Sequence, residues 1–132
     1  AGVPARNNLP AVGSRPAWAV DLCALPGKRV LCLGRHNYEY PTSADAWNTD
    51  TTTPGGFLRL FDENYRDIFL TNLPDVTPYA LAAQGTRVAV VGLARSDKAL
   101  TKDPLFPHPA GQLDAYLLIA DFPPGAPPQE RP

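Results

Sequence analysis

The sequence lacks methionine, an excess of either charge and any long hydrophobic run. Without methionine the chain cannot start at an initiator, and an Ala1-Gly2-Val3 start suits a mature end left by signal peptidase, although initiator removal or trimming also exposes Ala1. We therefore expect an exported protein, periplasmic or extracellular. Twelve Lys and Arg against 13 Asp and Glu provide no field to attract nucleic acid. The longest apolar run, Val88 to Leu93, is far shorter than the roughly 20 residues of a bilayer span.

Side chains that carry catalysis are also scarce. None of the three serines lies in a Gly-x-Ser-x-Gly motif, and the two histidines, His36 and His108, fall in different loops at non-equivalent positions. Two cysteines and two histidines lack the usual zinc-ligand spacing, and there is no phosphate-binding glycine loop or haem attachment motif. The sequence thus predicts no enzyme activity, no cofactor and no metal.

What the chain does contain is an internal repeat. Residues 26–34 and 84–92 share Gly, Arg, Val, an apolar stretch and a closing Gly at an offset of 58 positions. The match extends backwards to apolar runs at 18–24 and 76–82, and forwards, at an offset of 59, from 57–61 to 116–120. Repetition of this kind indicates two copies of one supersecondary unit.

Each copy is predicted to be an antiparallel β-sheet. Short aliphatic runs closed by glycine suit buried strands, and Phe57 to Phe61, a polar turn and Ile68 to Leu70 suit a hairpin. We expect four strands in the first copy and three in the second, because the proline-rich chain after Phe122 cannot continue a ladder. The expected organisation is all-β. An extended arm at residues 1–16 precedes a first repeat at 17–73, and a second repeat without its last strand at 74–122 precedes a Pro-rich tail at 123–132.

The order of motifs in each copy resembles the bacterial secreted beta-propeller repeat, across roughly residues 17 to 122. The first copy has Val30 to Gly34, Tyr40-Pro41-Thr42, Ala46-Trp47, Gly55-Gly56-Phe57 and Asp62 to Tyr65. The second has Val88 to Gly92, Phe106-Pro107, Gly111 and Asp114-Ala115-Tyr116. It departs from the family in the short spacing from Pro107 to Gly111 and in having only two copies. The resemblance implies blade-like sheets packed face to face, too few to close a ring.

The two cysteines are predicted to form a disulfide. A two-residue hairpin loop at Gly27-Lys28 would place Cys23 opposite Cys32 in a non-hydrogen-bonded pair, where Cα atoms lie about 4.5 Å apart. The alternative is that both are buried apolar positions, since the same pair in the second copy is Leu81 and Val90.

The candidate binding surface is the loop that begins at His36. It presents Tyr38, Tyr40 and Trp47 among amide and hydroxyl side chains, a composition that can bind a sugar or a protein. The favoured interpretation is packing, because the repeat resemblance implies that Tyr40 and Trp47 wedge against a neighbouring blade. Tyr38 is the freer tyrosine.

An unclosed pair of sheets should leave strand edges and an apolar sheet face exposed. We therefore expect a non-catalytic structural or binding subunit of a larger extracytoplasmic assembly, whose partners are other protein subunits or copies of itself. Two alternatives remain open at this point: a subunit of a propeller-type oxidoreductase whose cofactor ligands lie on another chain, and a small lectin that closes its ring by oligomerising.

Overall fold

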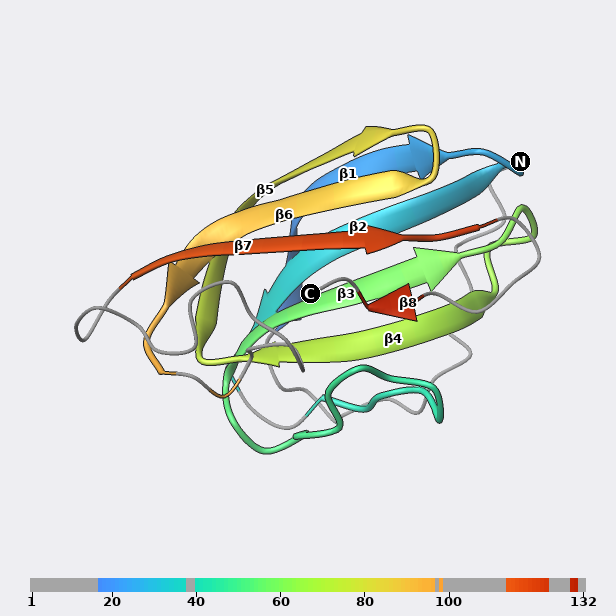
Figure 1. The fold of residues 1–132 in the computed structure, drawn as a ribbon. Coiled ribbons are helices and arrows are strands. Elements are labelled where there is room, and N and C mark those ends of the chain that lie inside the picture. Colours follow the sequence, from blue (N-terminus) through green and yellow to red (C-terminus); the bar gives the residue numbers. More distant parts are fainter. Residues whose placement is uncertain (1–16, 38–39, 97, 99–113, 124–128, 131–132) are drawn as a thin grey trace.

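The computed structural model describes residues 17–37, 40–96, 98, 114–123 and 129–130, and the fold in this part of the chain is all-β (Figure 1). The strands are β1 (Ala17–Leu25), β2 (Arg29–His36), β3 (Gly55–Phe61), β4 (Asp67–Pro74), β5 (Val76–Gln84), β6 (Arg87–Ala94), β7 (Asp114–Asp121) and β8 (Gln129–Glu130). No helix occurs among the described residues, and so none could span a membrane. The expected arm at 1–16 lies outside them.

The strands form two antiparallel meanders in chain order. The first sheet has the order β1-β2-β3-β4 and the second the order β5-β6-β7-β8. In the second sheet β5, β6 and β7 are full strands, whereas β8 supplies two residues, which pair with Ala120 and Asp121. The second sheet therefore has three full strands, as predicted. The segment expected to be a tail adds a two-residue fourth strand, which was not predicted.

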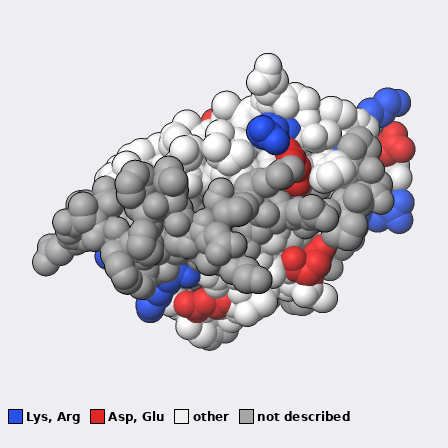
Figure 2. Space-filling view, in the orientation of Figure 1, with Lys and Arg blue, Asp and Glu red and all other residues white. Residues whose placement is uncertain are grey.

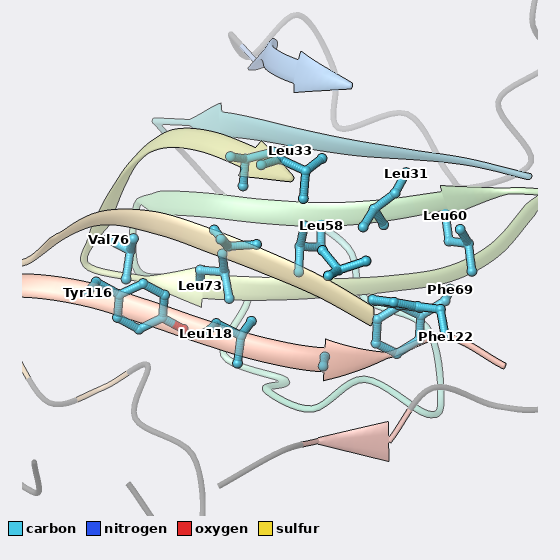
Figure 3. Packing of buried hydrophobic residues seen from close by; sticks show 14 of the residues in the cluster. Leu31, Leu33, Leu58, Leu60, Phe69, Leu73, Val76, Tyr116, Leu118 and Phe122 are labelled. Carbon is cyan, nitrogen blue, oxygen red and sulfur yellow. The ribbon is translucent and has the colours of Figure 1, made fainter. Parts of the chain in front are cut away.

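A shared hydrophobic core joins the two sheets. Figure 3 shows side chains of both sheets meeting in the space between them. The first sheet contributes Leu25, Leu31, Leu33, Leu58, Leu60, Phe69 and Leu73, and the second sheet and its extension contribute Val76, Leu81, Val88, Val90, Ala94, Tyr116, Leu118, Ala120 and Phe122. Neither sheet could bury its apolar face alone, so the repeats fold as one unit.

Burial differs between the two sheets in a way that matters for function. Strands β2 and β3 are buried along almost their whole length, so both faces of the first sheet are covered over these central strands, whereas the edge strand β1 is mostly exposed. Strand β6 instead alternates between buried and exposed or half-buried positions, and the described side chains of β7 from Ala115 to Ala120 alternate in the same way. The second sheet therefore has one covered face and one uncovered face.

The internal repeat is a true structural repeat in its strand pairing. Both sheets begin with a strand that bulges at the corresponding place, between Ala19 and Asp21 and between Pro78 and Ala80. Opposite these bulges lie the two repeated glycines, Gly34 and Gly92. At Gly34 an added Cβ would come within 2.2 Å of the Phe57 ring, which accounts for glycine there.

Equivalent positions allow the faces to be named. We call the face of the first sheet that packs on the second sheet its front face, and the opposite side its back face. By the offsets of 58 and 59, Leu31, Leu33, Leu58 and Leu60 on the front of the first sheet correspond to Ala89, Val91, Leu117 and Ile119. These lie on the front face of the second sheet, whose back face packs on the first sheet. The two sheets therefore stack front to back.

The predicted disulfide is wrong, and the turn length is the reason. The first hairpin pairs Leu25 with Arg29, which leaves a three-residue loop with φ of 82° at Gly27 and 57° at Lys28. Cys23 then pairs with Leu31 and Leu22 with Cys32, so the thiols point to opposite faces of the sheet. Both cysteines are free.

The two-residue loop that we expected in the first hairpin occurs in the second one instead. Gly85 and Thr86 form it between Gln84 and Arg87, and Leu81 then faces Val90, as the sequence comparison implied for that copy. One extra loop residue in the first copy thus separates the cysteines.

Three polar contacts fix the stacking of the sheets. Asp75, with φ of 60°, is the single residue between β4 and β5. Its N–H donates to Pro54 O of the first copy at 3.0 Å, and its carbonyl accepts a hydrogen bond from Arg95 N of the second copy at 2.9 Å. The Asp21 carboxylate on β1 accepts one from Leu81 N on β5 at 2.9 Å. The buried Arg29 guanidinium donates to Phe122 O at 2.5 Å. Each contact joins the first copy to the second.

The equivalent leucines Leu58 and Leu117 provide a matched test of the stacking. Leu58 is fully buried between the sheets and Leu117 is 62% exposed. We expect Leu58→Ala to lower the free energy of unfolding by about 2–5 kcal/mol, because it leaves a cavity, and Leu117→Ala to change it by less than about 0.5 kcal/mol. Urea denaturation of dilute protein measures both, and equal losses would contradict the front-to-back arrangement.

The register predicts free thiols of low reactivity. Burial raises the pKa of both cysteine thiols, and the Asp21 carboxylate raises that of Cys23 further. Iodoacetamide should therefore label the folded protein slowly at pH 7, because the thiolate is the reactive form. After unfolding without a reductant, mass spectrometry should find two labels, whereas an unlabelled pair would indicate a disulfide.

Candidate functional site

The front face of the second sheet is apolar and exposed to solvent. Its large side chains are Val91, Leu117 and Ile119, which are 43%, 62% and 39% exposed. Pairs across the strands bring these residues together: Val91 lies opposite Leu117, and Ile119 lies opposite Ala89. Ala80 and Ala82 on β5 extend the same surface, since they pair with Val91 and Ala89. A contiguous apolar patch of this kind marks an interaction surface.

One ion pair borders this patch on the same face of the sheet, because Arg87 and Asp121 continue the row of Ala89 and Ile119. Arg87 and Asp121 form an ion pair across the strands at the end of β6, with the Arg87 Nε and Asp121 Oδ1 atoms 3.3 Å apart. Figure 2 shows Lys, Arg, Asp and Glu in small scattered groups, with white, uncharged surface between them. Neither sign gathers into a field on the visible surface, so the patch would recognise apolar rather than charged partners.

The back face of the first sheet has the opposite character, because residues 40–53 fold over it. We call this segment the capping loop. The Tyr40 ring stacks on Phe57 with ring centroids 4.4 Å apart and on His36 at 5.3 Å. Cys32, Phe57 and Leu70 form a small second core beneath the loop, and Phe61 packs beside it. Cys32, Phe57 and Leu70 on this face are therefore covered by the chain itself, whereas Leu22 on β1, which pairs with Cys32 on the same face, is 59% exposed.

A buried ion pair completes the cap. The Arg59 guanidinium makes two hydrogen bonds to the Asp67 carboxylate, of which Nη2 to Oδ2 measures 2.9 Å, and Arg59 Nη1 donates to the Tyr40 hydroxyl at 2.9 Å. Burial opposes the charge on Arg59, but the bonds to Asp67 and Tyr40 outweigh it and raise its pKa. Burial raises the pKa of Tyr40, because it disfavours the charged phenolate. The Arg59 guanidinium is thus satisfied by hydrogen bonds within the cap.

The capping loop also covers the edge of β4. Ser43 N donates to Leu70 O at 3.0 Å, and Leu70 N donates to Ser43 Oγ at 3.0 Å. Further along, Asn48 N donates to Thr71 Oγ1 at 3.0 Å, and the buried Asn72 amide donates to carbonyl oxygens of the loop. The edge that the sequence led us to expect bare at this end is therefore occupied, which prevents another strand from pairing there.

Asp50 holds the end of the capping loop in shape. Its carboxylate accepts hydrogen bonds from the backbone and hydroxyl groups of Thr52 and Thr53, at distances from 2.7 to 3.1 Å. These bonds, led by that from the Thr53 hydroxyl, lower the pKa of Asp50 from 3.8 to about 2. The loop is thus fastened by a carboxylate that must be ionised to accept them all.

The residues of the predicted binding loop serve mainly as packing where the structure describes them. Tyr40 lies half-buried in the stack described above, and His36 is buried. Trp47 packs on Phe69 and Phe122, with ring centroids 5.0 and 5.6 Å away, at the border of the two sheets. Tyr38 lies outside the described residues. A ligand-binding role for the four therefore remains a prediction. The structure brings His36 and Tyr40 together in a ring stack, whereas Trp47 packs in a separate cluster with Phe69 and Phe122.

Sequence reasoning expected an apolar face but did not assign it to residues. The signal was present in Ala115 to Ala120, where every position is apolar, a pattern typical of a strand buried on both faces. In this chain only alternate positions of that strand are covered.

Elsewhere, no group of three His, Cys, Asp or Glu residues in the described part is placed to hold a metal ion.

No family model, curated protein or solved structure matches the chain. The resemblance to secreted propeller repeats therefore remains a prediction, and the functional argument rests on the geometry of the two sheets.

The low pKa of Asp50 predicts a pH-dependent effect of Asp50→Asn. A carboxylate whose pKa is lower in the folded than in the unfolded state stabilises the fold above its unfolded pKa, and this contribution disappears as the pH falls through the folded value. Asp50→Asn should therefore be less stable than the original protein at pH 6, and the difference should close towards pH 2. Urea midpoints at both pH values measure it. A difference that is constant with pH would contradict the assigned hydrogen bonds.

Proposed function

We propose that this chain is a non-catalytic structural or binding subunit of a larger extracytoplasmic assembly, and that the front face of its second sheet is the docking surface. The observation that carries the proposal is the exposure of Val91, Leu117 and Ile119 side by side on a regular sheet. Exposed apolar patches that are contiguous cost solubility, so a soluble protein that has one is expected to cover it.

The choice of a protein partner follows from the chemistry of this surface. The patch is one face of a β-sheet, and its described side chains are aliphatic. It offers no ring of polar groups of the kind that orients a small molecule. Apolar side chains on a regular strand lattice suit a partner with a complementary flat apolar surface.

The rest of the molecule supports the role of a rigid scaffold. The two sheets share one core, and the polar contacts of Asp21, Arg29 and Asp75 hold the sheets in a fixed relation. A docking face on such a framework is pre-organised, so little conformational entropy is lost on binding. The blade-like reading of the sheets and the extracytoplasmic location rest on the resemblance noted above, and they belong to the proposal.

Site-directed photo-crosslinking in cells of the native source tests the proposed docking role. A photoreactive residue at position 117 should give a discrete crosslinked product with a partner protein, identifiable by mass spectrometry. The matched control carries the same residue at position 63, where Glu63 is exposed on the turn between β3 and β4. The proposal fails if position 117 gives no product, or if both positions give the same products.

A further inference from the structure

The contact between the two sheets shows what kind of surface a front face accepts. The front face of the first sheet, with Leu31, Leu33, Leu58 and Leu60, packs on the back face of the second sheet. That back face presents Val88, Val90, Tyr116, Leu118 and Ala120. Because the sheets stack front to back, the contact is heterologous, and the arrangement does not use up the front face of the second sheet.

The uncovered front face has the same design as the covered one. Leu58 and Leu60 on β3 correspond to Leu117 and Ile119 on β7, and Leu33 corresponds to Val91. All three exposed positions are aliphatic, as their buried counterparts are. A surface that repeats the aliphatic side chains of a known interface at these three positions should fit the same kind of complement, which here is the back face of a further β-sheet.

A second copy of this chain offers a poor complement, because its free back face is capped over β3 and β4, although Leu22 at the β1 side of that face is exposed. Tyr40 covers Phe57, and Arg59 stands at the position that Leu118 occupies in the second sheet. Stacking there would displace Tyr40 and bring a further apolar surface against the Arg59–Asp67 pair. Breaking such a pair is costly, since it leaves a buried charge without its partner.

We propose that the front face of the second sheet receives the back face of a third β-sheet from a partner that is not a capped copy of this chain, and that the cap makes this association one-ended. The partner surface is apolar at the positions of Val90, Leu118 and Tyr116. This inference rests on the proposed function and specifies its partner. The chain would then be the terminal unit of a stack, with a covered outer end, as capping units are in repeat proteins.

The test uses a full-length variant whose back face is opened and whose front face is blocked. Tyr40→Ala removes the covering ring, and Arg59→Leu with Asp67→Leu replaces the ion pair by apolar side chains, a change that is often neutral or stabilising when both partners are replaced. Leu117→Lys blocks the front face. We call this the back-open variant. Circular dichroism and cooperative urea unfolding establish that it is folded.

Sedimentation velocity of the unaltered protein mixed with the back-open variant should reveal a 1:1 complex. The matched control replaces the unaltered protein by its Leu117→Lys variant, which should give no complex. A gain of affinity is expected from Ala80→Asp in the unaltered protein, because Ala80 stands where Asp21 accepts a hydrogen bond from the strand of the neighbouring sheet.

Absence of a complex with a folded back-open variant would overturn the inference. A variant that keeps Tyr40 but carries the other three changes serves if the full variant does not fold. A homodimer of the unaltered protein that Leu117→Lys dissociates would also overturn it, because the front face would then accept a second copy. Either result leaves the proposed docking role intact, which only the crosslinking at position 117 can refute.

Discussion

The front-to-back contact of the two sheets is the interaction on which the rest of the structure depends. Leu58 and its front-face neighbours cannot be buried within their own sheet, because an antiparallel meander presents one row of side chains to each side. The second sheet covers that row, and Asp75 as the sole connecting residue, together with Arg29 and Asp21, fixes how the sheets meet. Since this contact joins unlike faces, it buries the apolar front face of the first sheet but leaves the apolar front face of the second sheet exposed.

The two ends of the molecule deal with exposed apolar surface in different ways. At one end the chain supplies its own cover, with an aromatic stack led by Tyr40, a satisfied ion pair at Arg59 and a loop bonded along the edge of β4. At the other end, Leu117 on the front face of β7 stays 62% exposed. In the proposed docking role, this asymmetry would let the molecule join an assembly at one face only, because only a molecule with both faces open can grow in both directions.

Much of the fold follows from local patterns in the sequence. The repeated Gly-Arg-Val-apolar-Gly stretch identified β2 and β6, the polar turn at Asp62 identified the β3-β4 hairpin, and the prolines after Phe122 predicted a curtailed last strand. Less of the candidate site could be predicted. Which rows of side chains stay exposed depends on the partner of each face, and an apolar strand such as β7 has the same composition whether one face is covered or both are.

By itself, the sequence determined that the chain forms two related antiparallel sheets, because strand propensity, alternation and turn residues act over a few neighbouring positions. Only the tertiary structure decided the rest. One additional residue in the first hairpin loop sent Cys23 and Cys32 to opposite faces, since side chains on a strand alternate with a period of two. Likewise, the stacking direction left Leu117 exposed while Leu58 was buried, because burial belongs to the contact between sheets and not to the strand that carries the residue.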